Sequence, residues 1–407
     1  MKQEKLEDRL QMRRLTVDDT AQYNALLRYA FQVTDNELAS LGWNQKEMER
    51  SKKPVLKKTE SFGWFDGEKL ASQISVYPMQ VNLFGTMYNM GGVTGVATYP
   101  EYMGHGLMAH LMKKALDNMR ENHQCVSMLF PYLIPYYRKK GWEIVSDKMT
   151  YTIKDTQLPK HRKVGGMVER VDIDSEDVHR VHDAFSAMRH GALKRNELEW
   201  EEYWRWEADD VLVAVYYDAN EKPTGYLVYY IANDVFRIKE LVYVNQEARH
   251  GLWNYISAHF SMIEKVVGNN YTNEPMAFLL EDSEIQEEIE PYIMARIVDF
   301  EEFIRQYPFD IISIHDDLHF IIDDPIMECN CGDFSLRWDA AGNTILERGG
   351  TRGETVRCDI QTLTAMFYGY KRPTYLKRVE RLQANDTAVR ILEDIIPIEQ
   401  PYFSDYF

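Results

Sequence analysis

The chain has 407 residues, too many for one ordinary hydrophobic core, so two or three domains are expected. Its formal net charge of −17 argues against nucleic-acid binding, which depends on clustered lysines and arginines, but is compatible with a cationic substrate. No apolar run approaches the ~20 residues of a membrane span, and the charged N-terminal segment lacks the apolar core of a signal peptide. We therefore expect a cytoplasmic protein that binds no membrane. The four cysteines, with no histidine at metal-ligand spacing, are expected to be reduced and structural.

The first 96 residues predict a helix and several antiparallel strands. Residues 11–17 predict a strand, and residues 18–31 predict a helix capped by Asp18 or Asp19. The Asp66-Gly67 pair predicts a tight hairpin turn. Residues 74–84 and 88–96 predict two further strands of the same antiparallel meander.

The most informative segment is residues 93–119. It combines a buried strand (93–98), the loop Gly104-His105-Gly106 and an amphipathic helix that begins at Leu107. A strand, a glycine loop and a helix N-terminus can bind a pyrophosphate, because the free N–H groups of the first turn point at the anion. Glycine also lets the backbone approach the phosphates closely. The alternative is a glycine-containing loop that starts an ordinary helix.

Two common pyrophosphate-binding motifs do not fit this segment. A dinucleotide fold needs a third glycine and an acidic residue about 20 positions further on. A nucleoside-triphosphatase loop needs Gly-Lys-Ser/Thr after its first glycine. The sequence has neither pattern here.

The segment that follows supplies a candidate proton donor. Residues 125–130 predict the next strand, and Tyr136-Tyr137-Arg138-Lys139-Lys140-Gly141 comes soon after it. Because a phenol is a donor with a pKa near 10, Tyr137 could protonate a departing thiolate. A half-buried aromatic residue without a chemical role is the alternative.

The middle of the chain contains a weaker copy of the same pattern. A polar linker at residues 155–164 precedes predicted strands at 211–217, 225–231 and 236–244. His250-Gly251-Leu252 then repeats His105-Gly106-Leu107, with Arg249 in the place of Gly104. A side chain at that place would crowd the phosphates, so we expect a duplicate that keeps the fold and has lost the cofactor. Chance similarity of a tripeptide is the alternative.

The last third of the chain predicts a separate mixed region that starts near Pro291. The predicted helices cover residues 300–307, 359–367, 375–382 and 386–396, and the predicted strands cover residues 318–322, 333–338 and 344–348.

These segments together resemble a known family. Residues 103–108 resemble the acetyl-coenzyme A motif Gln/Arg-x-x-Gly-x-Gly/Ala of the GNAT superfamily of N-acetyltransferases, with Gly106 in place and departures at Met103 and Met108. Tyr137 stands in a stretch similar to the GNAT phrase Phe-Tyr-x-x-x-Gly-Phe-Glu, and the last third resembles a sterol carrier protein-like domain. Tandem GNAT folds followed by such a domain resemble the enhanced intracellular survival (Eis) family of acetyltransferases.

The resemblance implies a mixed α/β (α+β) fold with three domains. They are an active GNAT domain at residues 1–155, a degenerate GNAT-like domain at 156–290, and a sterol carrier protein-like domain at 291–407 that carries a catalytic C-terminus.

The resemblance also implies the site. Acetyl-CoA would be the co-substrate, with no metal, and Tyr137 would be the general acid. In the family the α-carboxylate of the final aromatic residue acts as general base, and Phe407 is the matching residue. The expected coenzyme-binding residues are Val96, Ala97, Thr98, Gly104, His105, Gly106, Leu107, Met108, Ala109 and Tyr132.

The C-terminal segment is expected to dock rather than fray. The sequence PYFSDYF is too aromatic for a solvated tail, and burial of its rings would anchor it. A free carboxylate has an ordinary pKa of about 3.3–3.7, and burial would raise it towards a useful value. Asp405 could help bind a polycationic acceptor or could be a solvated aspartate.

The expected reaction is direct transfer of an acetyl group to a primary amine of a cationic acceptor, such as an aminoglycoside, a polyamine or a lysine-like amine. The alternatives are an acyl-CoA or lipid-binding module without turnover, and a protein-lysine acetyltransferase. The resemblance further implies a homo-oligomer, with hexamers in some members.

Overall fold

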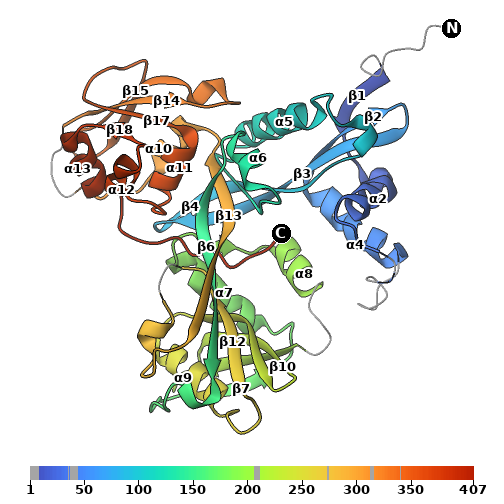
Figure 1. Cartoon of the computed structure of the whole chain (residues 1–407), viewed down its shortest axis with the longest axis vertical. Helices are drawn as coiled ribbons and strands as arrows, with labels where there is room; N and C mark the ends of the chain where they lie inside the picture. The colour runs from blue at the N-terminus through green and yellow to red at the C-terminus, as the bar shows by residue number, and fades with distance from the viewer. Residues whose placement is uncertain are drawn as a thin grey trace.

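Two β-sheets organise the chain in the computed structural model, which describes residues 9–34, 36, 45–205, 211–272, 275–311, 316–339 and 341–407 (Figure 1). Within these residues the larger sheet has 13 strands in the order β1-β2-β3-β4-β5-β13-β6-β12-β11-β10-β9-β7, with β8 paired to β3. Its strands are β1 (Leu10–Arg14), β2 (Glu60–Asp66), β3 (Lys69–Leu83), β4 (Thr86–Thr98), β5 (Val126–Leu129), β6 (Glu143–Lys154), β7 (Met167–Val171), β8 (Leu193–Lys194), β9 (Leu212–Tyr217), β10 (Pro223–Ala232), β11 (Val235–Tyr243), β12 (Lys265–Asn270) and β13 (Gln286–Ile297).

The smaller sheet belongs to the last third of the chain. Its order is β16-β15-β14-β17-β18. Its strands are β14 (Leu318–Asp323), β15 (Gly332–Trp338), β16 (Thr344–Arg348), β17 (Glu354–Asp359) and β18 (Gln383–Ala384).

The molecule consists of three units, each with its own set of helices. The first unit (β1–β6) carries α2 (Thr20–Ala30), α4 (Gln45–Lys58), α5 (Leu107–Glu121) and α6 (Ile134–Arg138). The second unit (β7–β12) carries α7 (Glu176–Met188), α8 (Glu197–Arg205) and α9 (Gln246–Ser257). The third unit (residues 298–396) carries α10 (Phe300–Gln306), α11 (Ile360–Phe367), α12 (Pro373–Arg378) and α13 (Asp386–Ile395). Within the described residues, no helix combines the length and the apolar character needed to cross a bilayer.

The long strands β6 and β13 connect the first two units. The C-terminal end of β13 pairs with β5, and most of its length pairs antiparallel with β6, which in turn pairs with β12 of the second unit. One continuous sheet therefore runs through both units. The domain boundary expected after residue 155 follows the end of β6, whereas the one expected after residue 290 falls inside β13.

The central feature of the first unit is the parallel pair β4 and β5. Their ladder runs from Met90–Val126 to Val93–Leu129 and ends there, although β4 continues to Thr98. On its other edge β4 pairs with β3, where the register shifts between Gln73 and Ser75. Gly95 sits in this irregularity at φ +61°, in the left-handed region that glycine tolerates. The bulge and the end of the ladder together separate β4 from β5 beyond Val93.

The third unit packs on the first through a shared apolar core and a buried ion pair. Arg296 at the end of β13 is fully buried, pairs with Asp324 at 2.5 Å, and donates from Nη1 to the Lys140 carbonyl at 2.6 Å. Gly141 has φ +92°, and a Cβ there would lie 2.6 Å from the same Nη1. Glycine is therefore required at position 141, both by the positive φ of the backbone and by the close approach of Arg296.

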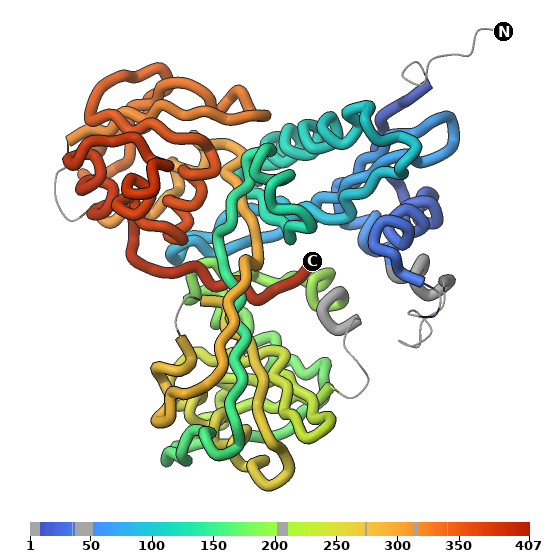
Figure 2. The backbone as a smooth tube through the Cα atoms, viewed as in Figure 1, coloured from blue at the N-terminus to red at the C-terminus, as the bar shows by residue number. Residues whose placement is uncertain are grey.

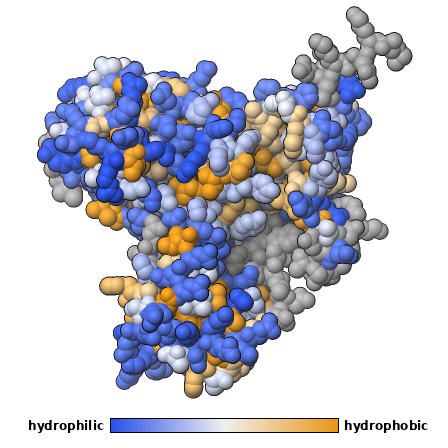
Figure 3. All heavy atoms as spheres, in the orientation of Figure 1, coloured by the Kyte–Doolittle hydropathy of each residue, from blue (hydrophilic) through white to orange (hydrophobic). Residues whose placement is uncertain are grey.

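The last residues form an extended tail that returns from the third unit. Residues 397–407 leave the end of α13 and run between the first and second units, so that the C-terminus lies near α8 (Figure 2). On the face shown in Figure 3, apolar residues gather at the centre, where the three units meet, and hydrophilic residues cover most of the periphery. The tail therefore crosses the junction of all three units.

The structure confirms the fold class and most of the expected elements, with some differences at their ends. A 3-10 turn, Val17–Asp19, precedes α2 and is capped by Thr16, and Asp19 is the N-cap residue of α2 but makes no side-chain capping bond to it. The Asp19 carboxylate accepts from the Thr16 backbone N–H at 2.8 Å, so it completes a capping box. Helices α4 and α8 and strands β6, β12, β13 and β17 were not expected from the sequence.

Candidate active site

The N-terminus of α5 is open towards the end of β4. Gly106 is the N-cap residue at φ +73°, and Gly104 has φ +85°. A Cβ at either position would meet no atom within 4 Å, so there is free space in front of the loop. Gly106 has no side chain to accept from the first N–H groups of the helix, whereas α7 and α10 are capped by Ser175 and Asp299. The loop therefore fits a pyrophosphate, because no side chain caps the first amides of α5, although the Ala109 and His110 N–H groups bond to the Gly106 carbonyl.

The rest of the loop is anchored from the sheet. Trp64 of β2 donates from Nε1 to the Leu107 carbonyl at 3.1 Å, and Leu107 is buried. Met108 packs against the apolar cluster under α5, whereas Met103 is 62% exposed and His105 is also exposed. The departures from the GNAT motif thus place one side chain, half-buried, against the core and the other in solvent.

The end of β4 presents its backbone beside this loop. Ala97 is buried, Val96 is half-buried, and the Thr98 hydroxyl lies 2.7 Å from the Ser72 hydroxyl. Because the ladder to β5 has already ended at Val93, the backbone of this segment on the β5 side is free to pair with a ligand. Val96 of this strand end and Met108 of α5 pack against the same apolar cluster, and the binding of the coenzyme by the expected residues stays a prediction.

Tyr137 lies in α6 with its ring in the apolar cluster that also contains Val93 and Leu129. Its ring is edge-on to Trp142, and only 7% of the residue is exposed. Burial raises the pKa of Tyr137 to about 12, with a smaller contribution from Tyr136. The phenol is therefore protonated at neutral pH and can act as a donor. Tyr132, which precedes α6, is 85% exposed, and its contact with the coenzyme stays a prediction.

The tail brings Phe407 to the separation of β4 and β5. A Cβ on Gly92 of β4 would come within 2.8 Å of Cε2 of Phe407, so the ring lies directly on this strand. Phe130, the residue after β5, holds the ring at a centroid distance of 5.4 Å, and Tyr406 at 4.7 Å. Phe407 packs against the apolar cluster that contains Met79 and Phe403, whereas Val93 and Tyr137 belong to the cluster under α5. The expected docking of the aromatic tail is therefore present.

Asp405 has neither of the roles considered for it. It is buried at 4% exposure and pairs with Arg195 at 2.5 Å, so it is neither solvated nor free to bind a cationic acceptor. Burial raises the pKa of Asp405 to about 6, with Arg195 acting in the opposite direction and Glu240 adding to the rise. The carboxylate belongs to the structure that holds the tail.

The second unit lacks the loop that the sequence suggested. Residues 249–251 lie inside α9, which begins after Asn245, and the Asn245 side chain accepts from Ala248 N at 2.8 Å. Gly251 faces the Tyr216 ring, where a Cβ would lie at 2.2 Å, so this glycine allows close helix–strand packing. Glu247 adds a carboxylate to the first turn. The helix terminus is thus capped and acidic, which disfavours a pyrophosphate.

Comparison with known protein families finds three matching domains along the chain. Residues 11–145 match an acetyltransferase (GNAT) domain family, residues 191–297 match a second acetyltransferase (GNAT) domain family, and residues 300–404 match a sterol carrier protein domain family. A comparison with curated protein sequences gives no significant match.

Similar solved structures cover the whole chain. A conserved protein of unknown function from Enterococcus faecalis, described as a probable N-acyltransferase, is 28% identical, with a TM-score of 0.89 and coverage of 98% of this chain and 99% of that one. A GCN5-related N-acetyltransferase from Anabaena variabilis has 22% identity, a TM-score of 0.85 and coverage of 98% and 100%. Eis1 from Mycobacterium abscessus shares the fold at 16% identity, with a TM-score of 0.79 and coverage of 98% and 100%.

The chain therefore combines two GNAT acetyltransferase domains with a sterol carrier protein domain. It is an acetyltransferase of the GNAT class that shares the fold of Eis1, and the GNAT fold implies the use of acetyl-CoA.

Some residues of the site were not found from the sequence. Phe130 could have been noticed as an aromatic residue at the end of a buried strand, and Gly92 as a glycine within one. Arg195 carried no local signal, because its importance comes from partners that are distant in the chain.

Proposed function

We propose that this protein transfers an acetyl group from acetyl-CoA directly to a primary amine of a cationic acceptor. The observation that carries the proposal is the position of Phe407, the last residue, on Gly92 where β4 and β5 separate. The Phe407 ring packs against the apolar cluster that contains Met79 and Phe403, and from there its α-carboxylate would reach the end of the β4–β5 ladder.

The chain contributes binding and two proton transfers. The amides of Gly106, Leu107 and Met108 would bind the pyrophosphate, with the glycine loop leaving room for it. When bound, acetyl-CoA supplies a thioester whose acetyl carbon gains a bond to nitrogen as its bond to sulfur breaks. The Phe407 carboxylate accepts the proton that the acceptor ammonium must lose before its nitrogen can attack.

Tyr137 provides the second proton, to the sulfur, and is reprotonated as the nitrogen loses its remaining extra proton on forming the amide. Its raised pKa of about 12 keeps the phenol protonated, so it can donate to the departing sulfur. A backbone N–H near Thr98, beyond the end of the β4–β5 ladder, would stabilise the developing negative charge on the acetyl oxygen. Catalysis would otherwise rest on positioning the two substrates.

The acceptor class rests on charge. A protein of net charge −17 attracts cations, which favours aminoglycosides, polyamines and lysine side chains over neutral acceptors. The cytoplasmic location, the homo-oligomeric state and the choice among these acceptors remain predictions.

A panel assay tests the proposal. Thiol release from acetyl-CoA is followed with an aminoglycoside, a polyamine and a lysine peptide, and mass spectrometry identifies the N-acetylated product. Turnover with a small polyamine or aminoglycoside supports the proposal. Turnover with the peptide alone indicates a protein-lysine acetyltransferase, and coenzyme binding without turnover on any amine indicates a binding module.

A further inference from the structure

A buried ion cluster in the second unit holds the tail two residues before its end. Arg195 donates from Nε to Asp405 Oδ1 at 2.5 Å and from Nη2 to Glu240 Oε1 at 2.7 Å. The side chains of Arg195, Glu240 and Asp405 are 0%, 4% and 5% exposed. Tyr226 donates to Glu240 Oε2 at 2.8 Å, the same oxygen that accepts from Arg195 Nη1 at 3.3 Å. The guanidinium thus orients two carboxylates at once, a geometry that suits its planar fork.

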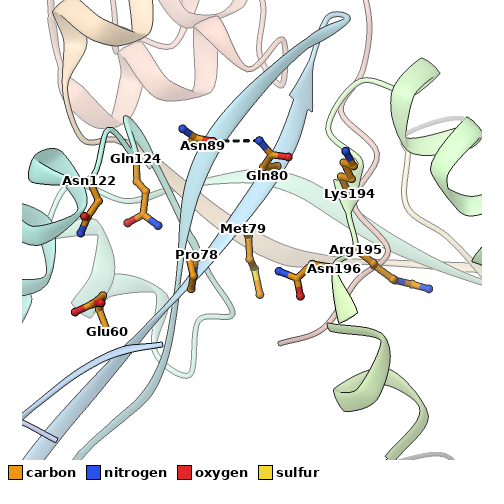
Figure 4. A pocket seen from close by; sticks show the side chains of 10 residues that line it. All are labelled: Glu60, Pro78, Met79, Gln80, Asn89, Asn122, Gln124, Lys194, Arg195 and Asn196. Carbon is orange, nitrogen blue, oxygen red and sulfur yellow. Dashed lines mark hydrogen bonds between the residues drawn. The ribbon is translucent and has the colours of Figure 1, made fainter. Parts of the chain in front are cut away.

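Arg195 is itself fixed relative to the sheet of the first unit. It follows β8, whose Leu193 and Lys194 pair with Val81 and Gln80 of β3. Figure 4 shows this segment, with Lys194 and Asn196 on either side of Arg195, beside the β3–β4 hairpin at the edge of an open hollow of about 580 Å³. Because β3 pairs directly with β4, Arg195 has a defined distance from the strand on which Phe407 rests.

Glu240 fixes the other end of the cluster. It lies in β11, in the part of the larger sheet that belongs to the second unit, and is buried. Arg195 therefore links a strand of the first unit, a strand of the second unit and the tail. The relative placement of the two units therefore determines where the last residues of the tail lie.

The cluster is close enough to the end of the chain to place it. Two residues span at most about 7 Å, so a fixed Asp405 confines the Phe407 carboxylate to a small region. The tail is held before this point as well, since Tyr402 N donates to the His190 carbonyl at 2.9 Å. Tyr292 of β13 donates to the Asp405 carbonyl at 3.1 Å. Asp405 is thus fixed through both its side chain and its backbone.

We propose that Arg195 is a positioning residue for catalysis: through Asp405 it holds the Phe407 carboxylate at the separation of β4 and β5. The second GNAT domain, whose own helix terminus is capped by Asn245, then contributes to the reaction by orienting the base of the first domain. This inference rests on the proposed function of Phe407.

Removing Arg195 would leave two buried carboxylates without their shared cation. Such a pair is unfavourable in a buried site, so the tail is expected to leave its place. A displaced general base reduces the rate of the chemical step by about 10- to 100-fold, because misplacement by about 1 Å already has effects of this size. Binding of acetyl-CoA involves the loop at α5 and is expected to change little.

The test compares Arg195→Met and Asp405→Asn with deletion of Phe407, alone and in combination, in the full-length protein. We expect each substitution to lower kcat by at least about 10-fold with the KM for acetyl-CoA within about threefold. In the protein lacking Phe407, the same substitutions should cause no further loss, because the group they position is gone. Arg195→Lys, which can replace only part of the fork, should retain an intermediate rate.

Two controls separate positioning from general destabilisation. Tyr217→Phe removes a hydrogen bond to Asp177 elsewhere in the second unit, and it should leave kcat unchanged. Hydrogen exchange measured by mass spectrometry should show faster exchange in residues 400–407 of Arg195→Met and Asp405→Asn, with the β4 and α5 peptides unchanged. If Arg195→Met does not fold, Asp405→Asn carries the same test with little change in volume.

The outcomes are distinguishable. If deletion of Phe407 lowers kcat but Arg195→Met and Asp405→Asn do not, the positioning role is wrong and the terminal base stands. If these substitutions lower kcat equally with and without Phe407, Arg195 has a structural role only, and the inference is overturned. If deletion of Phe407 itself has no effect, the proposed function of the terminus fails, and the inference falls with it.

Discussion

The ring of Phe407 rests on Gly92 so closely that a single added Cβ at position 92 would lie 2.8 Å from Cε2 of the ring. The two residues touch although they are far apart in the sequence. Gly92 lies within β4 of the first domain, and Phe407 ends the tail of the third. The missing side chain of one residue makes the space that the other occupies.

Gly92→Ala should therefore displace the end of the tail. Because Phe407 is terminal, its ring can move more easily than the strand, so we expect the thermal midpoint to change little and kcat to fall about 10-fold. Steady-state kinetics and thermal unfolding measure the two effects. In a Phe407→Ala background, which keeps the carboxylate and removes the ring, Gly92→Ala should have no added effect; a full additional loss there would contradict steric displacement.

Gly106→Ala should weaken coenzyme binding. Gly106 has φ +73°, and a side chain in this region costs about 1–2 kcal/mol, which the loop can avoid by changing its backbone and turning its amides away. We expect the Kd for acetyl-CoA, measured by calorimetry, to rise about 10-fold, which corresponds to ~1.4 kcal/mol. Gly342→Ala is the matched control, since Gly342 has φ +83° and equally free space but lies in the β15–β16 turn. An equal Kd in the wild type and Gly106→Ala would argue against the pyrophosphate site.

Tyr137→Phe should remove the proton donor and keep the packing. The ring stays in its apolar cluster, so the thermal midpoint should be nearly unchanged, whereas kcat should fall by about 100-fold, the lower end of the range for general acid catalysis. Tyr136→Phe is the control, because its ring contacts Tyr137 at 5.2 Å without the proposed role. Full activity of Tyr137→Phe would rule out the phenol as the acid.

Glu199→Gln should raise stability at high pH. Burial raises the pKa of Glu199 from 4.5 to about 7, with Asp405 adding to the rise. The folded protein therefore holds a proton that the unfolded chain has lost, so stability decreases as the pH rises from about 4.5 through 7. At pH 8 the substitution should increase the free energy of unfolding by about 2 kcal/mol, and this gain should shrink towards pH 5. Urea unfolding at both pH values measures the gain in the free energy of unfolding. A gain that is the same at pH 5 and pH 8 would contradict the raised pKa of Glu199.

Local signals predicted the first domain well. Gly104, Gly106 and the helical period from Leu107 are contained within a few residues, and glycine at these positions reports directly on the backbone conformation. Tyr137 could be placed because it follows a buried strand at short range. The aromatic composition of the tail correctly predicted that it docks. Phe403 is buried in the core, and Phe407 packs against it.

The remaining features depend on long-range contacts or lack a distinctive pattern. Asp405 meets Arg195 across 210 positions of sequence, so no spacing rule could have paired them. Arg249-His250-Gly251 resembled a phosphate loop, but Asn245 upstream supplies a stronger helix start, and the tripeptide falls inside α9. The first half of β13 is rich in glutamate and does not alternate like a half-buried strand, so its role in joining two domains was not visible.

The measurement that tests the account most directly is the pH dependence of kcat for the full-length protein and for the protein lacking Phe407, with one polyamine acceptor at saturating acetyl-CoA. If the terminal carboxylate is the base, deletion of Phe407 should lower kcat by about 100-fold or more near neutral pH. The residual rate should rise with pH as the fraction of unprotonated amine increases, so that the two proteins converge at high pH. An unchanged kcat and pH profile in the shortened, folded protein would contradict the account.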